Sequence, residues 1–111
     1  MAGAVVAGCA AALKHPTAQD AQWAAARWPE TTLADLEHGR ALYVQKCSGC
    51  HNLHLPEEFA PNEWEGYVAY MVVDAKLTPP EQLAITRFLT AASARVRGAT
   101  ATNDSTRGAG Q

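Results

Sequence analysis

The segment CSGCHNLH, residues 47–54, concentrates the side chains of this sequence that are best suited to chemistry. Cys47 and Cys50 are separated by two small residues, His51 follows the second cysteine directly, and His54 lies shortly after it. Thiolates and imidazoles can bind a metal ion, exchange disulfides or attach a haem. The rest of the chain has to distinguish among these three kinds of site.

Two of the three kinds lack the sequence context that they need. A structural zinc site requires four ligands, usually in two well-separated pairs, and the remaining cysteine is Cys9 near the N-terminus. A thioredoxin-like CxxC begins a helix in a βαβ unit. Here the expected helix precedes the motif, and no strand-like alternation of apolar and polar residues occurs. Zinc binding and thiol redox chemistry stay open as alternatives.

A CxxCH sequence is the attachment pattern for c-type haem. Its two thiols add to the two vinyl groups of one porphyrin, so they must lie close together and reach different edges. The histidine directly after the second cysteine is then placed under the iron as the proximal ligand. The pattern predicts covalent haem attachment through Cys47 and Cys50, with His51 on the iron.

Residues 39–51, GRALYVQKCSGCH, resemble the N-terminal segment of class I c-type cytochromes, and ITRFL, 85–89, resembles their last helix. In that family, a glycine and an aromatic residue of the first helix pack against the last helix near its own aromatic residue. Gly39, Tyr43 and Phe88 match these positions. The resemblance covers about residues 33–90. It implies a small all-α cytochrome c-like fold, with about three helices around one covalently bound haem c.

The sixth iron ligand must reach the opposite face of the ring. Three residues span at most roughly 10 Å, so His54 is too close to His51 to pass around the ring edge. Met71 is far enough along the chain, and class I proteins commonly use a distal methionine, although usually in a loop. We therefore expect His51 and Met71 as the metal ligands. The alternative for Met71 is a core side chain that fills a gap.

The resemblance also implies contacts around the ligands. A proline carbonyl in the family accepts the other N–H of the proximal histidine, and Pro56 is the nearest candidate, with Pro61 next. That bond would orient the His51 ring. Trp64 either donates its indole N–H to a haem propionate or packs in the core.

Three helices are expected to position these residues. Thr32 has the spacing to Asp35 of a capping box, and the helix that follows runs into Cys47. The second helix is expected to begin at Asn62. Its apolar residues recur at helical spacing: Trp64, Tyr67, Val68, Met71, Val72 and Ala75. The third has Thr78 as N-cap and Pro79 in its first position.

The chain divides into four predicted segments. Residues 1–9 resemble the end of a bacterial lipoprotein signal, because Val6-Ala7-Gly8-Cys9 matches the lipobox, although no basic region precedes it. Residues 10–31 are expected to be a tether with one helical turn, residues 32–92 the cytochrome domain, and residues 93–111 a disordered tail. The lipobox implies a lipid anchor at Cys9 and a periplasmic or cell-envelope location.

Composition limits the possible functions. The chain has 111 residues, a net charge of −2 and no basic cluster, which gives no electrostatic support for nucleic-acid binding. A packed part of about 60 residues is marginal without added stabilisation, which a haem would supply. We expect a non-enzymatic electron carrier that serves redox partner proteins. The alternative is a haem-based gas sensor or the haem subunit of a larger redox enzyme.

Overall fold

The computed structural model describes the backbone of residues 13–47 and 53–109, and the side chains of these segments as far as residue 98. The described chain forms the α-helices α2 (Ala18–Arg27), α3 (Leu33–Lys46), α4 (Pro61–Ala75) and α5 (Pro79–Ala109), with a short 3-10 helix, η2 (Pro56–Glu58). No strand occurs within these segments. The prediction of an all-α fold is confirmed.

The starts of two helices follow the predicted capping chemistry. At α3, the Asp35 amide donates to Thr32 Oγ1 over 3.2 Å, and the Thr32 amide donates to Asp35 Oδ2 over 2.9 Å. At α5, Thr78 and Glu81 exchange the same two bonds, over 2.9 and 3.3 Å. Each box satisfies amides that a helix start leaves without intrahelical partners.

The start of α4 lies one residue before the predicted one. Pro61 occupies the first helical position, and Glu63 accepts a 2.6 Å bond from the amide of Ala60. Proline suits this position because it has no amide hydrogen to leave unpaired. The predicted apolar period of the helix holds, since Trp64 and Val68 are fully buried.

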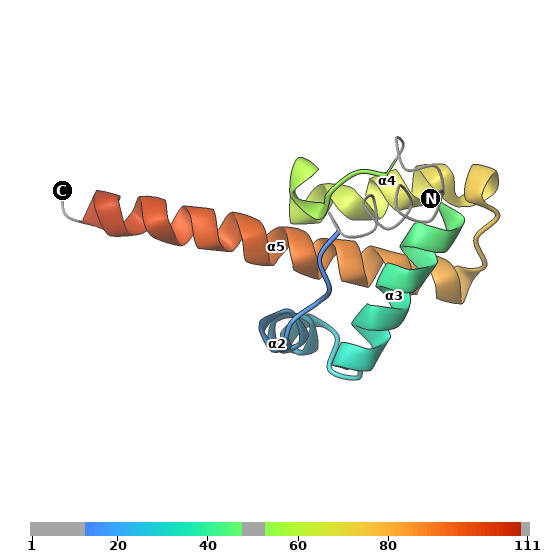
Figure 1. The fold of residues 1–111 in the computed structure, drawn as a ribbon, viewed down its shortest axis with the longest axis horizontal. Coiled ribbons are helices and arrows are strands. Elements are labelled where there is room, and N and C mark those ends of the chain that lie inside the picture. Colours follow the sequence, from blue (N-terminus) through green and yellow to red (C-terminus); the bar gives the residue numbers. More distant parts are fainter. Residues whose placement is uncertain (1–12, 48–52, 110–111) are drawn as a thin grey trace, which may run out of the picture.

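Helices α3 and α5 cross in close contact at Gly39 (Figure 1). A Cβ atom at Gly39 would overlap the carbonyl oxygen of Ala84 and would lie 2.9 Å from Phe88 Cβ. Only glycine allows the two backbones to approach this closely. Tyr43 and Phe88 are both buried in the core beside the crossing. The packing that the family resemblance implied for Gly39, Tyr43 and Phe88 is therefore present.

The main core lies among α3, α4 and α5, and we use this name for its buried residues. They are Leu13, Leu42, Tyr43, Trp64, Val68, Leu77, Ile85, Phe88, Leu89 and Ala92. Figure 1 shows α4 lying alongside α5, with α3 crossing α5. This arrangement brings the C-terminal end of α3, with Cys47, towards α4, with Met71.

The segment predicted to be a tether with one helical turn, residues 10–31, contains a longer helix in the part that the structure describes. Helix α2 has ten residues and begins with its own capping box, formed by Thr17 and Asp20. Its buried residues are Ala24 and Asp20. Because an alanine and an acid carry the contact, the segment has no stripe of large apolar residues from which a helix could be inferred.

The boundary at residue 93, where the predicted tail begins, falls inside helix α5. Helix α5 continues to Ala109, and its C-terminal part extends away from the other helices (Figure 1). Ser93 is fully buried, and Arg95 bonds Asp20 of α2. Alanine favours helix formation but adds little apolar surface. The sequence of this segment is rich in alanine and has no helical period of large apolar residues from which the helix could be predicted.

No helix within the described segments is both long and apolar enough to cross a membrane.

Candidate functional site

Cys47 is the C-cap residue of α3, and its amide donates a 3.0 Å bond to the carbonyl of Tyr43. The helix therefore fixes where the first cysteine of the CxxCH sequence stands. Cys50, His51 and the lipobox with Cys9 lie outside the described residues. Their predicted roles in haem attachment, iron ligation and lipid anchoring stay predictions.

A cavity of about 380 Å³ lies between the end of α3 and the C-terminal half of α4. We call it the sulfur cavity, because Cys47 from α3 and Met71 from α4 both line it. The other lining residues are Tyr43, Lys46, His54, Tyr67, Asp74 and Ala75. The structure thus brings together the two described members of the predicted site. The volume falls in the range typical of small-molecule pockets.

Met71 is partly buried and lies one helical turn after Tyr67. The neighbouring residues Trp64 and Val68 face the main core and are fully buried. Met71 instead lines the sulfur cavity. It is therefore not one of the fully buried side chains of the main core.

His54 lies on the same cavity. Its Nδ1 is 2.9 Å from Glu58 Oε1, and its ring makes edge contacts with Phe59 and Tyr67, each at 5.4 Å between centroids. The hydrogen bond to His54 is the largest cause of the lowered pKa of Glu58. These contacts fix the His54 ring from three sides, and its side chain is still 37% exposed. His54 therefore lies at the rim of the sulfur cavity, partly in contact with solvent.

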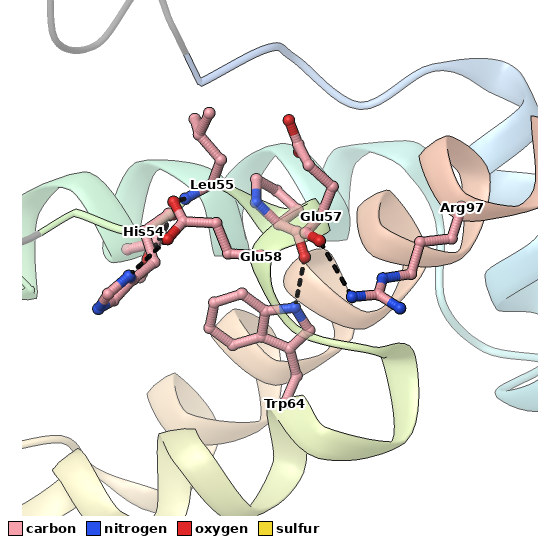
Figure 2. Close-up of polar contacts among 8 residues, drawn as sticks. His54, Leu55, Glu57, Glu58, Trp64 and Arg97 are labelled. Carbon is pink, nitrogen blue, oxygen red and sulfur yellow. Dashed lines mark hydrogen bonds and ion pairs between the residues drawn. The ribbon is translucent and has the colours of Figure 1, made fainter. Parts of the chain in front are cut away.

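The irregular segment that follows the CxxCH sequence is held by side-chain donors from three helices. The Tyr43 hydroxyl donates to the His54 carbonyl over 2.7 Å, and the Trp64 indole donates to the Pro56 carbonyl over 2.8 Å. Two further donors come from α5: Arg97 to the Glu57 carbonyl and Ser93 to the Phe59 carbonyl. Figure 2 shows Trp64 and Arg97 reaching the segment from different helices.

These bonds decide between the two predictions made for Trp64 and qualify the one made for Pro56. The buried Trp64 indole is a core group, and its N–H is used by the Pro56 carbonyl. That carbonyl is the acceptor which the family resemblance offered to His51. The α5 donors Ser93 and Arg97 could not be predicted from the sequence, because their acceptors are backbone carbonyls and leave no residue pattern.

Burial controls the ionisation of the groups around the sulfur cavity. It raises the pKa of the Cys47 thiol, and it is also the main cause of the raised pKa values of Tyr43 and Tyr67. Reactive cysteines of disulfide oxidoreductases have lowered pKa values, because the thiolate is the nucleophile. Burial thus disfavours the thiolate form of Cys47, which counts against the thiol redox alternative.

A zinc site is not formed by the described residues alone, since no three of their His, Cys, Asp or Glu side chains are placed to share an ion. Cys50 and His51 are not among the described residues.

Comparison of the chain with protein-family models, with curated proteins and with solved structures finds no match.

Proposed function

We propose that this protein transfers single electrons through one haem c attached at Cys47 and Cys50, with His51 and Met71 as axial ligands. The observation that carries the proposal is the sulfur cavity. Met71, from a different helix, lines the same cavity as Cys47, which supports a shared role for the two residues. The CxxCH sequence requires such a space directly beside its first cysteine.

The residues around the sulfur cavity fit this cofactor. Tyr43, Tyr67 and Ala75 supply aromatic and apolar surface for a flat ring, and Lys46 and Asp74 add charged groups. The crossing at Gly39 supports the proposal independently, because the family resemblance implied that contact from the sequence. The haem would supply an iron that accepts and releases one electron.

The protein side chains would then have two tasks. His51 and Met71 would occupy both axial positions, which leaves none for a substrate and favours electron transfer over catalysis. The bonds from Tyr43 and Trp64 to the segment after the motif hold the backbone near the site in one arrangement.

The lipobox at Cys9 supports a lipid-anchored carrier in the periplasm or cell envelope, where it would meet redox partner proteins.

The proposal is tested on protein matured in a host that attaches haem c. Denatured protein should keep about one haem per chain after acid–acetone extraction, because thioether bonds survive it. Loss of the haem into the solvent would show that no covalent attachment exists and would overturn the proposal.

The ligand assignment is tested by Met71→Leu, which roughly conserves volume and removes the sulfur lone pairs. Ferric protein should show the weak far-red band that the family resemblance implies for His/Met ligation. The substitution should abolish the band and make the iron reactive towards carbon monoxide. His54→Ala is the control and should keep the band. The reverse pattern would assign the iron to two histidines, and carbon monoxide binding by the unmodified protein would favour the sensor alternative.

A further inference from the structure

A second cavity, of about 330 Å³, lies among the C-terminal end of α2, the first turns of α4 and the middle of α5. We name it the tryptophan cavity, after Trp23 and Trp28 in its wall. It shares no lining residue with the sulfur cavity. We propose that it binds a small aromatic carboxylate, a planar ring with one negative charge. The proposal does not depend on haem binding.

The apolar part of the tryptophan cavity suits a ring. Trp23 and Trp28 meet edge to face, with centroids 5.9 Å apart and planes at 71°. Leu83 of α5 also lines the cavity, and 50% of its surface is exposed. An exposed leucine between aromatic walls leaves apolar area that a ligand ring can cover, and aromatic pairs add geometric preference to that burial.

The cationic part of the tryptophan cavity suits a carboxylate. The guanidinium of Arg27 lies 4.3 Å from the centroid of Trp23, and that of Arg87 lies 5.0 Å from the centroid of Trp28. Each guanidinium is thus held in place by stacking on an indole. Planar guanidinium groups donate well to carboxylates, with shorter and stronger bonds than neutral donors make.

Arg87 also has a donor that is not used. Its Nη1 donates to Glu30 Oε2 over 2.6 Å and to Thr31 Oγ1 over 2.7 Å. Its Nε is buried and has no hydrogen-bond partner among the described residues. A buried N–H without an acceptor is costly. Because Nε has almost no accessible surface, it is not a contact of the ligand; the bonds to Glu30 and Thr31 hold the Arg87 guanidinium in the cavity wall.

The remaining charges of the tryptophan cavity define the expected selectivity. Pro61 and Asn62 lie in the first turn of α4, whose start carries partial positive charge. Glu65 is the acidic side chain in the lining, and Glu30 partly offsets Arg87 from outside it. The two guanidiniums and the helix start therefore favour an anion, and Glu65 works against it.

The test is calorimetric titration of the purified full chain with 2-naphthoate and with the uncharged 2-naphthalenemethanol. The naphthoate should bind at least about tenfold more tightly, as expected for one charge-assisted contact. Arg27→Gln should remove most of that preference, whereas Glu65→Gln should tighten naphthoate binding several-fold. Neither change should alter the affinity for the alcohol.

Matched controls separate this site from general surface binding. Leu83→Ala should weaken both ligands, whereas Leu33→Ala, at a leucine that is 39% exposed outside the tryptophan cavity, should weaken neither. Lys14→Gln removes an exposed positive charge elsewhere and should leave naphthoate binding unchanged. Absence of naphthoate binding at millimolar concentration, equal affinity for both ligands, or equal effects of the paired variants would overturn the proposal.

Discussion

Helices α3, α4 and α5 are joined by the main core, whereas α2 is attached by a much smaller group of apolar residues. The buried residues of this second cluster, here called the α2 core, are Ala24, Leu36 and Ala91, with Ala21, Trp23 and Trp28 partly buried beside it. The main core contains tyrosine, tryptophan, phenylalanine and several leucines. Since apolar stabilisation scales with buried area, the two clusters cannot contribute equally.

Polar contacts compensate for the small apolar area of α2. Asp20 is fully buried, caps the helix through the Thr17 amide over 2.9 Å, and accepts a 2.7 Å bond from Arg95 Nε. Arg87 ties the chain after α2 to α5 through Glu30 and Thr31. Packing area therefore holds the main core together, and a few directional bonds hold α2 to it.

The largest effect is expected at the crossing of α3 and α5. Gly39→Ala places a Cβ against the Ala84 carbonyl and Phe88, and backbone atoms cannot move aside as a flexible side chain can. We expect a loss of about 3 kcal/mol in the free energy of unfolding, measured by urea denaturation.

Gly66→Ala is the matched control for Gly39→Ala. Gly66 also lies inside a helix, but a Cβ there meets nothing within 4 Å. It should stabilise the protein by about 0.5–1 kcal/mol through helix propensity alone. Similar effects at both glycines would contradict the close crossing and remove one support for the proposed fold relationship.

The second prediction concerns the buried anchor of α2. Asp20→Ala leaves Arg95 without its partner and removes the cap, and should cost about 2–3 kcal/mol, below the range for a fully buried pair because Arg95 is partly exposed. Hydrogen exchange should show the loss in residues 18–27, with the amides of α3 still protected. Asp74→Ala, at an exposed carboxylate of α4, is the control. Equal deprotection of α2 and α3 would show that the two clusters form one cooperative unit.

The third prediction uses two helix caps of the same design. Thr17 and Thr32 each accept a 3.2 Å bond from the aspartate amide three residues later. Thr32→Ala should lower global stability by about 1 kcal/mol, the usual cost of a lost N-cap. Thr17→Ala should mainly increase hydrogen exchange in α2. A global loss of the same size from both variants would contradict the difference in attachment.

The same contrast explains how much of this structure could be predicted from the sequence. The close contact of Gly39 with α5 near Phe88 could be expected from the resemblance of residues 39–51 and 85–89 to class I c-type cytochromes. The same resemblance, together with the distance of Met71 along the chain, suggested that Met71 would lie near the CxxCH sequence. Helix α2 could not be found in the same way, because its contacts are made by alanine and by Asp20.

The polar bonds around the site were unpredictable for a related reason. Tyr43 and Trp64 were recognised as large residues that pack on helices, yet their hydroxyl and indole groups bond the carbonyls of His54 and Pro56. Any residue other than proline offers the same backbone carbonyl and amide. The sequence therefore carries no pattern that would select these particular acceptors.

The smallest predicted effect is the pH dependence of the exposed cap of α3. Hydrogen bonds with the Thr32 amide and with the Thr32 side chain lower the pKa of Asp35 from its ordinary value of 3.8. The Asp35 carboxyl thus holds its proton less tightly in the folded state than in the unfolded state. Its charge stabilises the fold at pH values above the ordinary pKa, and this stabilisation is lost as the pH falls through the pKa of the folded state.

Asp35→Asn keeps an oxygen acceptor for the Thr32 amide but removes the charge, so it should lower stability by less than about 1 kcal/mol at pH 6, because the carboxylate is exposed. The difference from the unmodified protein should shrink as the pH falls below the ordinary Asp value of 3.8 and the natural carboxyl becomes protonated as well. Urea midpoints measured across this range give the comparison. Glu57→Gln, at an exposed carboxylate with no hydrogen bond or ion pair among the described residues, is the control and should follow the unmodified protein at every pH. A difference for Asp35→Asn that stays constant down to pH 2 would show that the cap stabilises α3 through geometry alone, without help from its charge.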